Sequence, residues 1–129
     1  MELAAESERQ RPDGGPGSVL RRLAVSRQLR EAVSAAVGVE VVPTYNALYQ
    51  YHDDSTRLRR HRDGPGYDLV FHLTVFHEAP ASVLVVDDEA VSLAVGEGLV
   101  LRGQDVEHGW TPLAPGERRT LVAVGFSPR

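Results

Sequence analysis

Residues 69–77 read LVFHLTVFH, and this run decides the fold because its composition is typical of a buried β-strand. Its first three residues are apolar on both faces of a strand, as is the run LVV at 84–86. Similar short runs continue on both sides, and turn-forming segments such as 63–66 and 96–98 separate them. The middle of the chain is therefore expected to be a β domain in which some strands are covered on both faces.

Nine strand-like runs follow Gly38, with no helical pattern between them: 39–42, 47–51, 58–61, 69–77, 83–86, 90–95, 98–101, 107–110 and 120–126. This spacing predicts an antiparallel sandwich or barrel of the jelly-roll kind, preceded by one helix. The helix is expected to begin at Ser18 as N-cap and to end at Gly38. Its apolar stripe contains Val25, Leu29, Ala32, Val33 and Ala36. Residues 1–17 are expected to be a flexible leader, and residues 18–129 a single domain.

Composition excludes several kinds of chemistry. The chain has 129 residues and no cysteine, and all 14 of its basic residues are arginine. Disulfides, thiolate zinc sites, cysteine nucleophiles and Schiff-base lysines are therefore ruled out. A net charge of −4 argues against a nucleic-acid partner. The sequence shows neither a secretory signal nor a run long enough to span a membrane, so we expect a cytoplasmic protein without a membrane partner.

Two histidines and one aspartate form the candidate metal site. His61 and Asp63 are two residues apart, so on an extended chain both side chains project from the same face. His108, on a short predicted strand after the turn at 96–98, is the best candidate for a third ligand. Two imidazoles and one carboxylate are the facial triad of non-haem Fe(II) oxygenases.

The order His61-x-Asp63, His108 and then Arg118 resembles the Fe(II)/2-oxoglutarate-dependent dioxygenases, including their prolyl-hydroxylase-like members. The resemblance extends over residues 45–126 and implies a double-stranded β-helix, a cupin-like barrel. It implies Fe(II) held by His61, Asp63 and His108 as the catalytic centre. It also implies 2-oxoglutarate and O2 as cosubstrates, with release of succinate and CO2. The residues that it assigns to 2-oxoglutarate are Arg118, Thr120, Tyr49 and Tyr51.

Several alternatives stay open at this stage. Arg119 competes with Arg118, and strand alternation allows only one of them to point inward. Substrate contacts are assigned to His72, Thr74 and Trp110, each of which could instead be an ordinary core residue. The expected reaction is hydroxylation of a C–H bond in a small amino acid or secondary-metabolite intermediate, although desaturation or cyclisation would use the same site. The other readings are a hydroxylase of a peptide or protein residue, such as a prolyl residue, and a non-catalytic cupin-like metal-binding module. A homodimer would cover apolar surface that a single helix leaves exposed.

Overall fold

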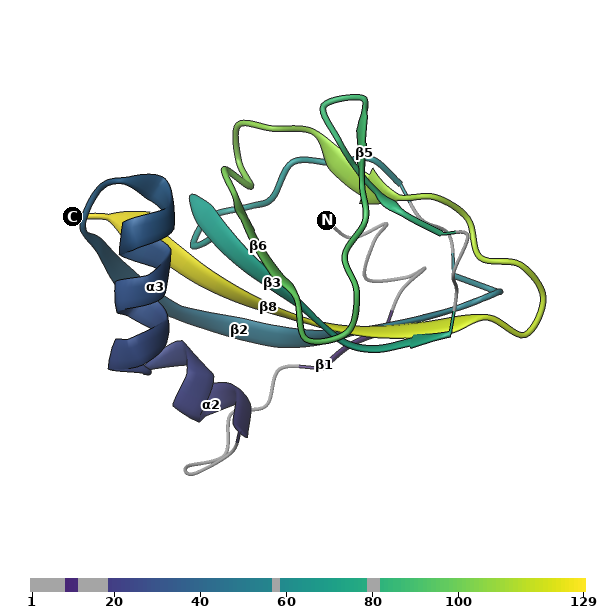
Figure 1. The fold of residues 1–129 in the computed structure, drawn as a ribbon, viewed down its shortest axis with the longest axis horizontal. Helices are drawn as coiled ribbons and strands as arrows, with labels where there is room; N and C mark the ends of the chain where they lie inside the picture. Colours follow the sequence, from purple (N-terminus) through teal and green to yellow (C-terminus); the bar gives the residue numbers. More distant parts are fainter. Residues whose placement is uncertain (1–8, 12–18, 57–58, 79–81) are drawn as a thin grey trace.

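The computed structural model describes residues 9–11, 19–56, 59–78 and 82–129, and the fold of these residues is mainly β. Two antiparallel sheets make up most of it, and two short helices lie between the first and second strands of the chain (Figure 1). The elements in chain order are β1 (Arg9–Arg11), α2 (Val19–Ala24), α3 (Arg27–Val37), β2 (Val41–Asp53), β3 (Leu69–Glu78), β4 (Leu84–Val86), β5 (Glu89–Val91), β6 (Gly98–Leu101), β7 (His108–Trp110) and β8 (Arg118–Pro128).

The expected single helix is two helices, which is a correction to the sequence-based prediction. Ser26 interrupts the helical pattern because its backbone is extended and its hydroxyl accepts a hydrogen bond from the Leu29 amide at 3.1 Å. It is therefore the N-cap of α3, while Ser18 lies outside the described residues. Val25, expected on the buried stripe, is 49% exposed at this break. The predicted end at Gly38 is confirmed, since Gly38 takes the left-handed conformation at φ 79°.

The larger sheet has five strands in the order β1-β2-β8-β3-β6, all antiparallel. β2 and β8 are its longest pair, with a register that runs from Val41 opposite Pro128 to Asp53 opposite Arg118. β1 pairs with residues 49–51 of β2. The expected flexible leader therefore contains a paired strand, and its other residues lie outside the described part of the chain.

The smaller sheet has the order β5-β4-β7, and one more residue joins its β7 edge. His61 forms an isolated antiparallel bridge with His108, the first residue of β7. The strand predicted at 58–61 is reduced to this bridge among the described residues 59–61. The strand predicted at 90–95 is also shorter, since β5 ends at Val91.

Both faces of the larger sheet are covered. On one face, α2 and α3 pack on a cluster that contains Leu20, Ala24, Val33, Val41, Leu69, Val122, Val124 and Phe126. On the other face, Leu121 packs with Leu84 and Trp110 of the smaller sheet, and Ala123 packs with Val70 and Leu101. Successive residues of β8 therefore alternate between a face toward the helices and a face toward the smaller sheet. We call these the helix face and the inner face.

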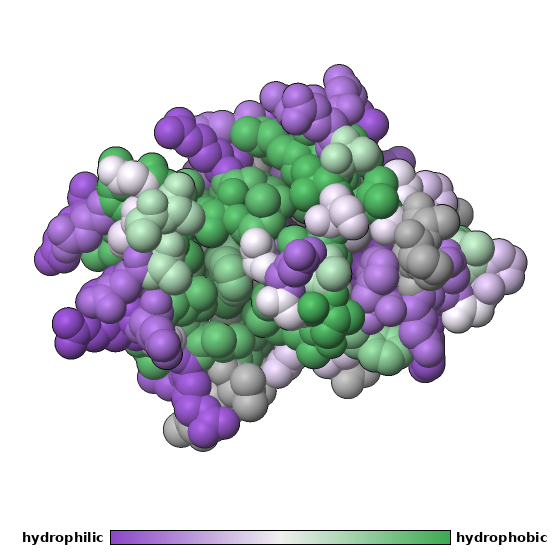
Figure 2. All heavy atoms as spheres, in the orientation of Figure 1, coloured by the Kyte–Doolittle hydropathy of each residue, from purple (hydrophilic) through white to green (hydrophobic). Residues whose placement is uncertain are grey.

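A broad area of hydrophobic residues lies at the centre of the side shown in Figure 2, and hydrophilic residues gather at the helix end and around the rim. Exposed large apolar side chains in the described chain include Val75 and Val95, at 45% and 57% exposure. Apolar surface of this kind is compatible with the expected homodimer, which stays a prediction. Among the described helices, none has the length and hydropathy that crossing a membrane requires.

Candidate metal centre

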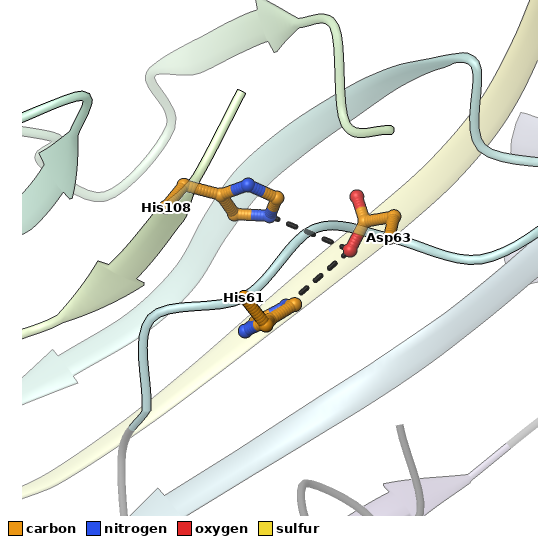
Figure 3. Close-up of side chains that lie close together, drawn as sticks. All are labelled: His61, Asp63 and His108. Carbon is orange, nitrogen blue, oxygen red and sulfur yellow. Dashed lines mark ion pairs between the residues drawn. The ribbon is translucent and has the colours of Figure 1, made fainter. Parts of the chain in front are cut away.

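His61, Asp63 and His108 lie together between the two sheets, with one ligand atom of each within 4.8 Å of the others. Nε2 of His61 is 3.3 Å from Oδ1 of Asp63, and Nε2 of His108 is 3.4 Å from the same oxygen (Figure 3). The backbone sets this arrangement. The amide of His61 donates to the carbonyl of His108 at 2.8 Å, and the reverse bond is 2.9 Å. The amide of Asp63 donates to the carbonyl of Gly103 at 2.7 Å.

Backbone carbonyls fix which nitrogen of each imidazole carries a proton. Nδ1 of His61 lies 2.9 Å from the carbonyl oxygen of Arg59, and Nδ1 of His108 lies 2.9 Å from that of Val106. A carbonyl oxygen only accepts hydrogen bonds, so each Nδ1 must be the protonated donor. The Nε2 atom of each neutral ring then presents its lone pair to Asp63, which is how second-shell partners orient metal-binding histidines.

The electrostatics of the centre favour a positive charge between the three side chains. Burial alone would raise the pKa of Asp63, but attraction to the neighbouring imidazoles of His108 and His61, which are positively charged when protonated, outweighs that effect and holds this pKa well below its usual range. Nε2 of His108 and Oδ2 of Asp63 are buried and make no hydrogen bond of good geometry to the described residues. Two lone pairs that face an ionised carboxylate require protons or a cation between them, so a divalent metal fits the donor set.

Two glycines allow the ligands to come this close. A Cβ on Gly103 would lie 2.2 Å from Oδ2 of Asp63, and a Cβ on Gly109 would lie 2.8 Å from the carbonyl oxygen of Arg59. The first glycine makes room for the carboxylate, and the second lets β7 approach the segment that carries His61. Their positions around His108 in the sequence could have signalled a crowded backbone, although the reason for the crowding is visible only in the fold.

The assignment of Arg118 to the inner face is wrong. Its side chain is 63% exposed on the helix face and pairs with Glu78 at 3.1 Å. Arg119 points inward instead and is 1% exposed, with its guanidinium carbon 3.7 Å from the centre of the Trp110 ring. Its Nη1 donates to the Ser82 hydroxyl at 2.8 Å, and its Nη2 lies 3.0 Å from Nδ1 of the buried His52. The inward-pointing arginine is one residue later than the prediction, and in a strand one residue is the difference between the two faces.

Tyr49, Tyr51 and Thr120 are displaced from the centre for the same reason. Tyr51 is opposite Thr120 in the sheet and Tyr49 is opposite Val122, so all three predicted cosubstrate contacts share the helix face with Arg118. The two tyrosine rings lie 5.9 Å apart there, and Tyr49 packs against the helix-side cluster. Strand alternation correctly predicts that these residues share one face of the sheet, but that face is the one away from His61, Asp63 and His108.

The three predicted substrate residues do lie on the inner face. His72 is buried, with its ring centre 5.8 Å from that of His108 in an edge-on arrangement. Thr74 is fully buried and donates to the carbonyl of Leu93 at 3.2 Å, which gives it a structural role. Trp110 forms the surface on which Arg119 stacks. His72 therefore lies beside the candidate metal centre.

A cavity of about 230 Å³ adjoins Asp63 and includes residues that the sequence analysis missed. Gln50 and Tyr67 contribute polar groups to it, and Leu48, Val70 and Ala123 contribute apolar ones. Gln50 lies between Tyr49 and Tyr51, so assigning the opposite face of this strand to the site would have predicted Gln50 instead of the two tyrosines. Tyr67 follows the turn at 63–66, and no motif marks it in the sequence.

A scan against protein-family models and a search of curated proteins found no match to this chain. The interpretation of the centre therefore rests on its own geometry and chemistry.

Proposed function

We propose that this chain is an Fe(II)- and 2-oxoglutarate-dependent oxygenase that hydroxylates a C–H bond of a small substrate. The observation that carries the proposal is the convergence of two Nε2 atoms on one oxygen of Asp63, with both imidazoles fixed in the ligating tautomer. Protein sites with two histidines and one carboxylate leave coordination positions open for cosubstrate and oxygen.

The strand order supports a double-stranded β-helix as the scaffold. Successive strands change sheet along much of the chain: β2 lies in the larger sheet, His61 joins the smaller, β3 lies in the larger and β4 in the smaller. The change recurs from β6 to β7 and from β7 to β8. Alternation of this kind between two facing antiparallel sheets is typical of jelly rolls. In such a scaffold the active site lies between the inner faces of the two sheets, and His72 and Arg119 lie on the inner face of the larger sheet here.

His61, Asp63 and His108 would hold the iron, which supplies oxygen activation when bound. The backbone carbonyls of Arg59 and Val106 keep the two imidazoles oriented, and the pKa of Asp63 keeps its carboxyl ionised at neutral pH. The fit of the donor set to Fe(II) is good because imidazole and carboxylate both suit this ion.

Arg119 takes the cosubstrate role that the resemblance gave to Arg118. It points inward from β8, and its guanidinium is held against Trp110, two residues after His108 on β7. A planar guanidinium can grip a carboxylate with two parallel hydrogen bonds, which sets the orientation of a dicarboxylate as well as its affinity. We propose that this group binds the far carboxylate of 2-oxoglutarate.

The proposal is tested by metal binding followed by turnover. Calorimetry should show one Mn(II) site per chain, which Asp63→Ala and His108→Ala remove and the matched histidine control His77→Ala keeps. His77 lies against Trp110, outside the triad. The Mn(II) form should then bind 2-oxoglutarate, and the Fe(II) form should produce succinate. Metal binding without 2-oxoglutarate binding would favour the non-catalytic cupin-like module, and full metal affinity in His108→Ala would disprove the assigned ligand set.

A further inference from the structure

Arg119 lies between two histidines in the larger sheet. His52 of β2 is opposite Arg119 on one side, and His77 of β3 is opposite it on the other. Directly opposite residues of antiparallel strands share a face, so the three side chains form a row across the inner face of this sheet. The two histidines therefore flank the arginine from equivalent positions.

His52 is the histidine that bonds to this arginine. Its Nδ1 lies 3.3 Å from Nε of Arg119 and 3.0 Å from Nη2 of the same guanidinium. Both side chains are buried, with His52 3% and Arg119 1% exposed. Nδ1 of His77 is also buried, yet it makes no hydrogen bond to the described residues. The two histidines of the row thus differ in their contact with the guanidinium, and His77 provides a comparison for His52.

The chemistry of the guanidinium fixes the tautomer of His52. A guanidinium keeps its charge in proteins and has five N–H donors but no acceptor. Nδ1 of His52 must therefore be the acceptor, with its lone pair toward Nε and Nη2 and the ring proton on Nε2. Hydrogen bonds in which the donor is charged are stronger than those between neutral groups, so this contact holds the two side chains firmly.

Two further contacts hold the guanidinium in place. Nη1 donates to the Ser82 hydroxyl at 2.8 Å, and that hydroxyl donates to the carbonyl of Thr111 at 2.7 Å. The guanidinium carbon lies 3.7 Å from the centre of the Trp110 ring, which supports one face of the group. His52 meets the Nε and Nη2 edge and so opposes rotation within that plane. Because a guanidinium has five donors, one arginine can bond to His52, Ser82 and a carboxylate at the same time.

We propose that His52 is a positioning residue, which holds the guanidinium of Arg119 in the orientation that grips the far carboxylate of 2-oxoglutarate. This inference rests on the proposed function, in which Arg119 binds the cosubstrate. An oriented guanidinium lowers the entropic cost of binding a carboxylate. It also selects a dicarboxylate over a 2-oxoacid with one carboxylate, because the shorter set of charges leaves the arginine without its anion. His52 would therefore determine cosubstrate specificity without touching the cosubstrate.

The variants His52→Asn and His52→Leu isolate the hydrogen bond, because their new side chains have nearly the same shape. The oxygen of the asparagine occupies about the place of Nδ1 and accepts hydrogen bonds, whereas the leucine has no acceptor. Calorimetry on the full-length chain loaded with Mn(II) measures the affinity for 2-oxoglutarate. This affinity should fall at least about tenfold in His52→Leu and stay within about threefold of the unaltered protein in His52→Asn. Equal affinities in the two variants, whether high or low, would overturn the proposal.

A matched variant and a matched ligand separate positioning from a general disturbance of the sheet. His77→Leu makes the same replacement on the other side of Arg119 and should keep 2-oxoglutarate affinity within about threefold. The ligand 2-oxopentanoate has the carbon chain of 2-oxoglutarate with a methyl group in place of the far carboxylate. Its affinity for the Mn(II) protein should be the same in His52→Leu as in the unaltered chain. A parallel loss of 2-oxopentanoate affinity, or an equal loss of 2-oxoglutarate affinity in His77→Leu, would contradict a positioning role.

The tautomer of His52 gives a test that needs neither a metal nor a variant. NMR of the imidazole nitrogens in the metal-free chain at neutral pH should show His52 with its proton on Nε2 and none on Nδ1. A proton on Nδ1 would overturn the proposal, even if circular dichroism shows that His52→Leu is unfolded. Failure of the unaltered Mn(II) protein to bind 2-oxoglutarate would instead disprove the proposed function, and with it the cosubstrate role of Arg119. The tautomer would still decide whether His52 holds this arginine.

Discussion

Replacing Gly103 by alanine should weaken metal binding although no ligand residue is replaced. The new Cβ would lie 2.2 Å from Oδ2 of Asp63, whereas ordinary contacts begin at 3.4 Å, so the carboxylate must retreat by roughly 1 Å. Metal–ligand distances tolerate only about 0.2 Å. The Cβ would also lie 2.8 Å from the carbonyl oxygen of Tyr67, which adds about 1–3 kcal/mol of destabilisation from overpacking.

Calorimetry with Mn(II) measures the effect, and thermal unfolding monitors the fold. We expect affinity to fall about 10- to 100-fold in Gly103→Ala. Gly64→Ala is the matched control, because a Cβ there meets nothing within 4 Å, and its affinity should stay within about threefold of the unaltered protein. A folded Gly103→Ala protein that binds Mn(II) normally would refute the idea that this carboxylate position is required.

Four further results are expected. Arg118→Ala should change the free energy of unfolding by less than about 1 kcal/mol and leave 2-oxoglutarate affinity intact, because this side chain is exposed. Arg119→Ala should lower the free energy of unfolding by about 3–5 kcal/mol and abolish 2-oxoglutarate binding, because this side chain is buried. Urea titration measures the stability and calorimetry the affinity, and equal effects of the two variants would contradict the assigned faces. Because the folded-state pKa of Asp63 lies below its ordinary value of 3.8, its stabilising effect is complete above that pH and disappears as pH falls further. Acid titration of the metal-free chain should therefore show a smaller loss in Asp63→Asn. Burial raises the pKa of Tyr67 to about 12, so stability should instead decline between pH 10 and pH 12, and Tyr67→Phe should suppress that decline in alkaline denaturation curves. Ser26→Ala should lower thermal stability by about 1 kcal/mol through loss of the α3 cap, and no change would show that the cap is dispensable.

The β-rich fold could be predicted because turn residues and strand runs agree along the chain. The run at 69–77 became β3, and the turn at 96–98 precedes β6 as expected. The helix pair was harder, because Ser26 carries a weak signal and the hydrophobic pattern continues across it. A serine within a helical pattern becomes an N-cap only if the segments before and after it pack against different parts of the protein, and that packing is visible only in the tertiary structure.

The two faces of β8 could not be assigned from sequence for a physical reason. Val122 and Val124 pack against helices, while Leu121 and Ala123 pack against the smaller sheet. Alternation identifies an inward face when the other face is polar, but here both faces are buried and both read as apolar. The positions of His61, Asp63 and His108 did not depend on this phase, so the structure brings them together as predicted.

The backbone pairing of His61 with His108 has a consequence for how the protein unfolds. The two residues are about fifty positions apart, and this chain has no cysteine with which to tie such distant segments together. A divalent ion held by both imidazoles would act as a removable cross-link that closes this large loop. Its largest effect should be on the rate at which the smaller sheet separates from the larger one, so chelation would shorten the lifetime of the folded protein more than it would slow its formation.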